Sequence, residues 1–235
     1  DEGDGDGTPV EIVLYKNNVD GKGAAYGSHE NYLVRRDVPF EALAEVLTPF
    51  LVTRPVLVGS GRVGIGQRSE RPGFQISQRA DYVESEIGLQ TFNRPIINTR
   101  DEPHADNARW RRLHVINGDA NRFDVPIYLK IATTDLLLWF LEQAYTEGSD
   151  RFTEALTRLR RLTIVGDPVE EHWALSHDPT LSHELRTQSG SMTALAIQRA
   201  FLDVISPAVT RVEDAQAHRA LALWRQVLDA LEQWR

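Results

Sequence analysis

The strongest constraint on the fold is a change of sequence pattern near residue 133. Before this point, short apolar and β-branched runs at 55–66, 73–88 and 94–100 are separated by glycines and charged turns, which is typical of an antiparallel sheet. Beyond it, apolar residues recur at helical spacing, first in TTDLLLWFLEQAYTEG and last in VEDAQAHRALALWRQVLDALEQW. Strands followed by helices predict an α+β fold and not an alternating parallel sheet.

The same patterns divide the chain into parts. Residues 1–9 are acidic and glycine-rich and predict a flexible tether, residues 10–132 predict the sheet-rich part of a domain, and residues 133–235 its helical part. A loop rich in glycine and asparagine, residues 17–31, lies within the sheet-rich part. The other elements expected there are a helix at 40–51 and strands at 10–16, 32–36, 111–121 and 124–131.

Composition and charge limit the classes of partner. The chain has 26 basic and 34 acidic residues, a net charge of −8, which argues against nucleic acid as its main partner. No apolar run reaches the roughly 18 residues that cross a membrane, so no membrane partner is expected. The absence of cysteine excludes disulfides and cysteine chemistry and is compatible with the cytoplasmic location that we expect. Residues 62–112 hold nine Arg and seven Asp or Glu, which suits an anionic ligand.

Two motifs that look catalytic have simpler interpretations. The glycines at 59, 61, 64 and 66 match the spacing of a dinucleotide loop, but a second strand-like segment follows them where a helix would be required. They predict a glycine-rich hairpin. Ser176, His177 and Asp178 are the residue types of a nucleophilic triad, but adjacent residues cannot form the required relay, so we expect a turn before a helix. For His172, His183 and His218 we expect surface or packing roles.

Two polar clusters carry the candidate chemistry. His29 lies in the glycine-rich loop, close in sequence to Lys16, Asn17, Asn18, Asp20, Glu30 and Asn31. The second cluster, NTRDEPHADNARWRRLH, combines possible metal ligands with phosphate-binding guanidinium groups, although a solvated charge run has the same composition. Strand alternation puts Arg112 and His114 on one face, opposite Leu113 and Val115, and Arg100 shares this face if the chain stays extended across the intervening turn. Such a face would suit ATP, whose charge is neutralised by Mg²⁺ and arginine.

Three longer segments resemble a known family. YKNNVDGKGAAYGSHENYLV, PIINTRDEPHAD and RRLHVINGDAN resemble the carboxylate-amine ligase-like enzymes of pupylation, which are related in fold to glutamine synthetase. The resemblance runs from about Val10 to the end of the chain and weakens after Glu142. GSGRVGIGQ and GFQISQRADYVESEIGLQT look like the Pup deamidase and depupylase branch of this family, whose sister branch contains the Pup ligases.

The resemblance implies a fold and a set of site residues. It implies a curved antiparallel sheet that cradles ATP and Mg²⁺, with helices packed behind it. His29 and His114 match ligands of a magnesium site, and Arg100 matches an arginine that faces the nucleotide phosphates. We expect Arg112 and Asn31 to contact the nucleotide as well.

The implied activity is an ATP- and Mg²⁺-dependent hydrolysis of amide bonds. Enzymes of this branch deamidate the C-terminal glutamine of Pup and cleave the isopeptide bond between Pup and a lysine, so Pup and pupylated proteins are the expected partners. A Pup ligase and a non-catalytic Pup- or nucleotide-binding homologue are the alternatives.

One departure from the family pattern concerns the acidic residues. The family's early Glu-x-Glu metal motif and its nucleophilic Asp would both precede Asp1, so we assign no catalytic residue within these 235 residues. A complementary polypeptide segment that carries these acidic residues is therefore an expected partner.

Overall fold

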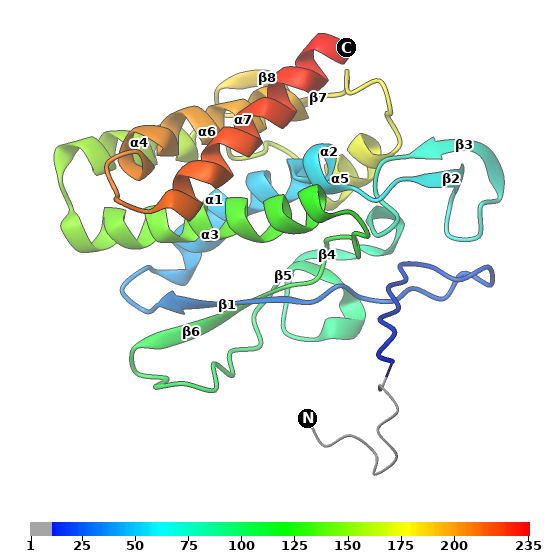
Figure 1. Ribbon diagram of the computed structural model, residues 1–235, viewed down its shortest axis with the longest axis horizontal. Helices are drawn as coiled ribbons and strands as arrows, with labels where there is room; N and C mark the ends of the chain where they lie inside the picture. Colours follow the sequence, from blue (N-terminus) through cyan, green and yellow to red (C-terminus); the bar gives the residue numbers. More distant parts are fainter. Residues whose placement is uncertain (1–10) are drawn as a thin grey trace.

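A computed structural model describes residues 11–235 and shows helices packed on one side of a small sheet (Figure 1). The sheet has four strands in the order β1-β6-β5-β4. These strands are β1 (Glu30–Arg35), β4 (Ser85–Gly88), β5 (Pro95–Asn98) and β6 (Trp110–Val115). The helices are α1 (Phe40–Thr53), α2 (Pro55–Val58), α3 (Asp124–Glu147), α4 (Asp150–Arg160), α5 (Pro168–Ser176), α6 (Ala194–Val209) and α7 (Ala215–Trp234).

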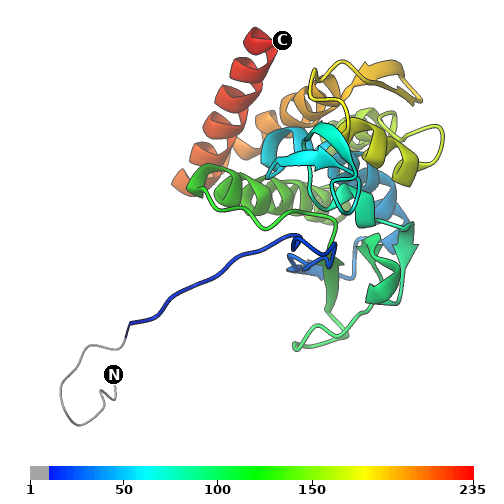
Figure 2. The ribbon, with the colours of Figure 1, turned by 90° about the vertical axis from the view of Figure 1, so that its right-hand side faces the viewer.

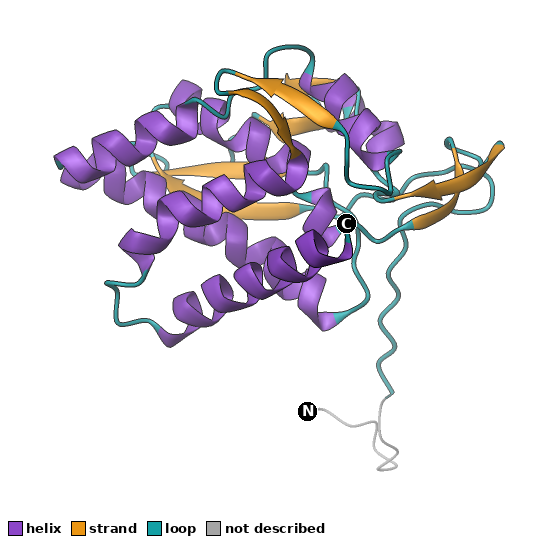
Figure 3. Ribbon diagram, turned by 90° about the horizontal axis from the view of Figure 1, so that it is seen from above, coloured by secondary structure: helices purple, strands orange, loops and turns teal. Residues whose placement is uncertain are grey.

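Two hairpins and two short 3₁₀ turns complete the fold. One hairpin, β2 (Arg62–Ile65) with β3 (Arg71–Gln75), extends from one end of the molecule (Figure 3). The other, β7 (Glu184–Thr187) with β8 (Gly190–Thr193), precedes α6. The 3₁₀ turns are η1 (Ala80–Tyr82) and η2 (Thr91–Asn93). The first hairpin confirms that the glycines between 59 and 66 form a hairpin and not a dinucleotide loop.

The sheet has an apolar face and a polar face because its strands alternate. In β1, Tyr32 and Val34 are buried while Asn31 and Leu33 are exposed. The register pairs Tyr32 with Leu113, so the inward residues of the two strands share a face. The helices cover this apolar face, and the opposite face of the strands stays free of helices (Figure 1).

The helical layer owes its stability to one continuous apolar core. α1 is buried along almost its whole length, which explains why apolar residues occupy nearly every position in it. Its Phe50 ring packs edge to face against Phe201 of α6 at 5.3 Å and Trp224 of α7 at 6.0 Å between ring centroids. No helix within residues 11–235 is both long and apolar enough to cross a membrane.

The α+β class is confirmed, with several differences from the sequence prediction. Pro55–Val58, at the start of the strand-like run 55–66, forms the short helix α2, and the hairpin of β7 and β8 lies within the part predicted to be helical. The sheet is only partly antiparallel, because β1–β6 and β5–β6 are antiparallel but β4–β5 is parallel. The strand predicted at 124–131 is wrong, since α3 begins at Asp124 and continues through Thr133. Pro126 is compatible with this start because backbone N–H groups in a first helical turn have no partner within the helix.

The strand predicted at 10–16 is also wrong in the part that the structure describes. Residues 11–16 are extended but pair with no strand among the described residues. Ile12, Leu14 and Tyr15 are 80%, 86% and 90% exposed, and the segment projects from the body of the molecule (Figure 2). The tether predicted at 1–9 lies outside the described residues.

His183 and the triad-like segment have structural roles, and His218 is exposed on the surface, as predicted. Ser176 ends α5, and His177 caps this helix, so the turn follows a helix and does not precede one as predicted. Ser176 Oγ donates to the carbonyl of Ser77 at 3.0 Å, and His177 Nε2 lies 2.8 Å from an Asp81 carboxylate oxygen. His183 lies 2.7 Å from Glu171. No Ser–His–Asp relay is formed.

A buried ion pair joins the sheet to the helices. Arg54 follows α1 directly, and its guanidinium makes two bonds of 2.7 and 2.8 Å to the Glu30 carboxylate at the start of β1. The two side chains are 1% and 2% exposed. Thr134 of α3 accepts a further bond from Arg54, and Tyr32 donates its hydroxyl to Glu30. Burial disfavours the guanidinium charge, but the Glu30 carboxylate outweighs this and raises the pKa of Arg54.

Replacing Arg54 with methionine is expected to lower the free energy of unfolding by about 3–5 kcal/mol, because it leaves the Glu30 carboxylate buried without a cation. Urea unfolding measures the loss. The matched double variant Arg54→Met with Glu30→Gln removes both charges and is expected to recover a large part of it. Equal stability of the single variant and the wild-type chain would contradict this assignment.

Acid is expected to destabilise the fold through His172. This side chain is fully buried in α5, its Nδ1 lies 3.0 Å from the Val52 carbonyl, and burial lowers its pKa from 6.5 to about 4. The unfolded chain therefore binds a proton between these pH values while the folded chain does not. The contribution of His172 to the free energy of unfolding is complete above pH 6.5, and about 3 kcal/mol of it is lost as the pH decreases toward 4.

The His172 contribution is measured by comparing unfolding at pH 7 and pH 4.5 in the wild-type chain and in His172→Gln. The glutamine amide keeps a donor for the Val52 carbonyl but does not titrate, so the variant should lose less stability between the two pH values. Identical losses in both proteins would exclude His172 as the source.

Candidate functional site

The polar face of the sheet brings both sequence clusters together. β6 lies between β1 and β5, and the register pairs His114 with Asn31 on one side and with Asn98 on the other. Arg112 is two residues before His114 and therefore points to the same face. The alternation predicted for Arg112 and His114 is confirmed, and Asn31 joins them from the neighbouring strand.

The central feature of this face is a pair of imidazoles. His29 precedes β1, and its Nδ1 lies 2.8 Å from Nε2 of His114. His114 is 2% exposed because the ring of His29 lies across it, with ring centroids 4.9 Å apart. A Cβ on Gly27 would lie only 2.6 Å from His29 Nε2, so the absence of a side chain at Gly27 leaves room for the imidazole.

Both histidines lie in an environment that favours their neutral form. Burial, with the charges of Arg112, His29 and Arg100, lowers the pKa of His114 to about 4. Burial and the charges of Arg79 and Arg112 also lower the pKa of His29. Neutral imidazoles can share one hydrogen bond or offer lone pairs to a cation.

The predicted nucleotide-binding residues lie around this pair. Arg112 Nε donates to the Asn31 side-chain oxygen at 2.7 Å, which fixes both groups on the open face. Arg100 follows β5, and its charge contributes to the low pKa of His114. Its own guanidinium is half exposed and pairs with Glu102 at 3.1 Å.

Other members of the sequence clusters do not reach the pair. Asp101 accepts from the side chain of Arg36 and from the backbone N–H of Arg112, and it closes the 99–109 loop. Glu102, His104 and Asp106 are on the surface of the same loop or at its solvent edge. These groups fit the alternative of a solvated charge run.

Asn18 and Asp20 organise the loop that carries His29. The Asn18 amide donates to the Ala120 carbonyl at 3.1 Å and accepts the Ala120 N–H at 2.6 Å. The Asp20 carboxylate accepts two backbone N–H groups of its own turn, from Lys22 and Ala24. These residues position the loop that carries His29.

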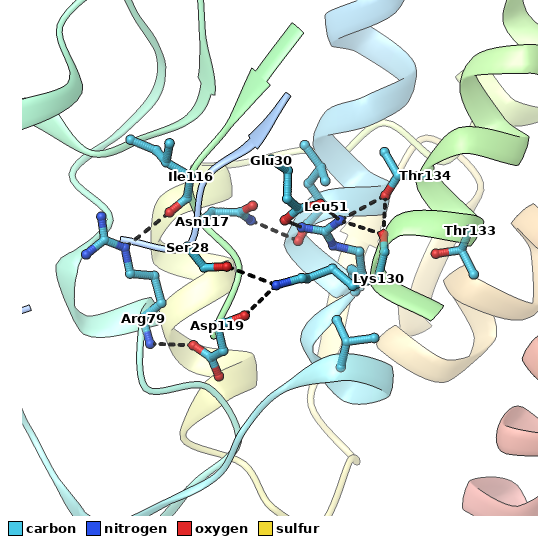
Figure 4. A network of polar contacts seen from close by, with 12 residues as sticks. Ser28, Glu30, Leu51, Arg79, Ile116, Asn117, Asp119, Lys130, Thr133 and Thr134 are labelled. Carbon is cyan, nitrogen blue, oxygen red and sulfur yellow. Dashed lines mark hydrogen bonds and ion pairs between the residues drawn. The ribbon is translucent and has the colours of Figure 1, made fainter. Parts of the chain in front are cut away.

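The sequence patterns did not single out Arg79, which lies beside the pair. Its side chain is 5% exposed, and Nε donates to the Ile116 carbonyl at 3.1 Å (Figure 4). A terminal nitrogen of its guanidinium comes within 3.8 Å of the Cβ position of Gly27, on the side of His29. Arg79 follows the β2–β3 hairpin in sequence, so no spacing rule links it to His29 or His114. Only the tertiary fold reveals it.

A polar network behind the face holds these segments in place (Figure 4). Lys130 of α3 is 6% exposed, and its ammonium donates to Ser28 Oγ at 3.0 Å and to the Asp119 carbonyl at 2.7 Å. The Asp119 carboxylate accepts hydrogen bonds from the backbone N–H groups of residues 60, 78 and 79 and from the Ser77 hydroxyl. One buried lysine therefore ties a helix to the loop before His29 and to the turn that orients Arg79.

The loop, β1 and α3 enclose a cavity next to the imidazole pair. Its volume is about 520 Å³, and its lining includes His29, Ser28, Tyr26, Lys16 and Lys130. Lys16 and Lys130 bring positive charge to one part of the lining, while Ile127 and Ile131 make another part apolar, which suits a ligand with both polar and apolar groups.

The described residues provide only part of a metal site. Within residues 11–235, no group of three or more His, Cys, Asp or Glu side chains is arranged to hold a metal ion. Mg²⁺ prefers oxygen ligands in octahedral geometry. The His29–His114 pair could therefore contribute ligands, but carboxylates from elsewhere would be needed to complete a magnesium site.

The family model and the similar proteins all point to one family. A family model described as Pup-ligase protein matches residues 3–235. The chain is 50% identical over 226 residues to a Pup deamidase/depupylase of Mycolicibacterium smegmatis, covering 95% of this chain and 43% of that protein. It is 42% identical over 234 residues to a Pup–protein ligase of Micrococcus luteus, covering 96% of this chain and 47% of that protein.

Solved structures of Pup ligases have the same fold. One, in complex with ADP, aligns with a TM-score of 0.76 at 36% identity and covers 96% of this chain and 48% of that chain. Another, a complex between Pup and its ligase, aligns with a TM-score of 0.73 at 39% identity, over 92% of this chain and 43% of that chain. The chain spans less than half the length of these relatives. By the family match and by fold, the chain belongs to the Pup-ligase protein family.

Proposed function

We propose that this chain forms one side of the active site of an ATP- and Mg²⁺-dependent amidohydrolase. The proposed enzyme deamidates the C-terminal glutamine of Pup and cleaves isopeptide bonds between Pup and lysine. The observation that carries the proposal is the His29–His114 pair, whose ring nitrogens lie 2.8 Å apart, near Arg112, on a sheet face that helices leave open. Identity of 50% to a deamidase/depupylase, against 42% to a ligase, favours hydrolysis over ligation.

The nucleotide is assigned to the polar sheet face. Arg112 and Asn31 are fixed there by their mutual hydrogen bond, and Arg100 lies two residues after β5. The buried Arg79 lies near Gly27, on the loop that carries His29. Guanidinium groups bind phosphate oxygens through paired N–H donors, so this arrangement suits a triphosphate. A related Pup ligase was solved with ADP, which supports a nucleotide at this fold.

The metal is assigned to His29 and His114. Two neighbouring ligands of an octahedral magnesium, each at about 2.1 Å, lie about 3 Å apart. The 2.8 Å between His29 Nδ1 and His114 Nε2 matches this separation. When bound, the ion would neutralise phosphate charge. The two residues would hold it from one side only, and carboxylates must provide the other ligands.

We further propose that a complementary polypeptide segment supplies those carboxylates and the nucleophilic Asp. Among the described residues β1 pairs only with β6, so its second edge can accept another strand next to Asn31. Alternate side chains of an added strand would point to the polar face, beside the imidazole pair. Residues 11–16, like the free edge of β1, have no strand partner in the described part of the chain.

A ligase is the second candidate, because both solved structures of this fold reported above are Pup ligases. The two reactions differ in their use of ATP. A ligase consumes one ATP for each isopeptide bond formed, whereas a hydrolase needs the nucleotide bound and breaks the bond with water. Product analysis therefore separates them.

The activity is tested on the complete assembly with ATP, Mg²⁺ and a Pup peptide that ends in glutamine. We expect release of ammonia without stoichiometric ADP. His114→Ala is expected to lower the rate by about 10- to 100-fold, because removing a group that holds or orients a metal commonly costs this much activity. Glu154→Gln, on the exposed surface of α4, serves as the control and should retain full activity.

Two outcomes would contradict the proposed function. Stoichiometric ADP together with a new isopeptide bond would assign the chain to a ligase. ATP binding by calorimetry without turnover in the complete assembly would indicate a non-catalytic homologue. Unchanged turnover in His114→Ala would refute the site assignment while leaving the activity in place.

The complementary segment is tested by purification of the tagged chain from its native cells. We expect a polypeptide with a Glu-x-Glu segment and the nucleophilic Asp to accompany it, or to be part of the same polypeptide. Mg²⁺-dependent ATP binding should need that polypeptide and should be lost in His29→Ala. Full Mg²⁺-dependent binding by residues 1–235 alone would show that no further carboxylates are required.

A further inference from the structure

An apolar groove runs along α3 on the side where α7 begins. Its volume is about 500 Å³, and α3, the end of α6 and the first turns of α7 form its walls. The apolar residues that define it are Ile127, Ile131, Trp139, Val209 and Val212. Ile131 is 45% exposed, although it lies in the middle of a helix whose other face is buried. Ile127 and Ile131 also line the cavity beside His29, whereas the proposed reaction gives no role to Trp139, Val209 or Val212.

The shape of the groove fits a helix. Ile127, Ile131, Asp135 and Trp139 are spaced four residues apart and form one straight ridge on α3. At 1.5 Å per residue the ridge is about 18 Å long, the length of a helix of about 12 residues. Small residues of the groove wall, Ala132, Ala217 and Ala220, permit close approach of a helical backbone.

The groove carries negative charge within its apolar lining. Asp135 lies between Ile131 and Trp139 on the ridge and forms no ion pair with any residue in the 11–235 range. Asp214 lines the same groove and accepts the N–H groups of Gln216 and Ala217 as the cap of α7. Burial and the charge of Asp214 raise the pKa of Asp135, which places the two carboxylates in one field. The nearby basic Arg219 is stacked over the ring of Tyr128 at 5.5 Å.

We propose that this groove binds an amphipathic helix of a protein partner that presents a lysine or arginine between apolar residues. Apolar side chains at positions i and i+4 of that helix would pack on Ile127, Ile131 and Trp139. Asp135 is exposed to solvent, and a helix that covers the groove would desolvate its carboxylate. The basic side chain of the bound helix would pair with this carboxylate and compensate for the lost solvation. An acidic helix would place like charges together and is excluded by the same geometry.

The inference is tested with two synthetic helical peptides of about 14 residues that share one leucine stripe. They differ only in a central lysine or glutamate. Calorimetry with the full chain should show the lysine peptide binding at least 10-fold more tightly. In Asp135→Lys the preference should reverse, so that the glutamate peptide binds more tightly. Glu154→Lys on α4 makes the same charge change away from the groove and should leave the preference unchanged, and far-UV circular dichroism confirms that both variants are folded.

Three results would overturn the inference. Equal binding of the two peptides, or no binding of either, would exclude a basic amphipathic helix as the occupant. A preference for lysine that persists in Asp135→Lys would place the binding elsewhere. Self-association of the chain that Ile131→Glu abolishes would assign the groove to a second copy. None of these measurements depends on ATP or on amide hydrolysis, so they stand apart from the proposed function.

Discussion

The Glu30–Arg54 ion pair is the contact on which the site depends, because it fixes the start of β1. His29, Glu30 and Asn31 are consecutive, and strand alternation sends Glu30 inward while its neighbours remain on the polar side. With Glu30 held by Arg54 at two points, β1 cannot slip by one residue without burying Asn31 and exposing a carboxylate that lacks its partner. Burying two charges costs desolvation free energy, so the ion pair adds little net stability, but it specifies the register of β1.

Lys130 fixes the loops next to the sheet in a similar way. Its ammonium donates hydrogen bonds to the Ser28 hydroxyl and to the Asp119 carbonyl in place of water. One side chain therefore holds both the loop before His29 and the turn before α3. Burial lowers the pKa of Lys130, and the Glu30 carboxylate counteracts this shift. The core beneath the open face is therefore polar, and each buried charge in it has defined partners. This buried polar network can hold the two imidazoles in contact with each other while the outer side of the sheet face remains free.

Sequence patterns predicted the features that depend on local chemistry. The helix expected at 40–51 is α1 with two additional residues, the glycines from 59 to 66 form a hairpin, and Arg112 and His114 share a sheet face. Features decided by distant contacts were not predictable. α3 begins nine residues before the predicted start at Thr133, because Ile127 and Ile131 belong to one apolar stripe of the helix. A short apolar run such as 124–131 has a pattern that fits a strand as well as a helix. Arg79 reaches His29 only through the turn that Asp119 organises.

The arginines and the histidines of the open face are electrostatically linked. Arg79 and Arg112 disfavour a proton on His29, and Arg112 and Arg100 disfavour one on His114. Burial lowers the pKa of both imidazoles most, and the positive charge that would attract a phosphate lowers it further, so the neutral form with an available lone pair is favoured. A metal cation alone would meet repulsion from these guanidinium groups, whereas a cation that arrives with a polyphosphate brings its own compensating charge. The face is thus suited to a metal–nucleotide complex more than to either component alone.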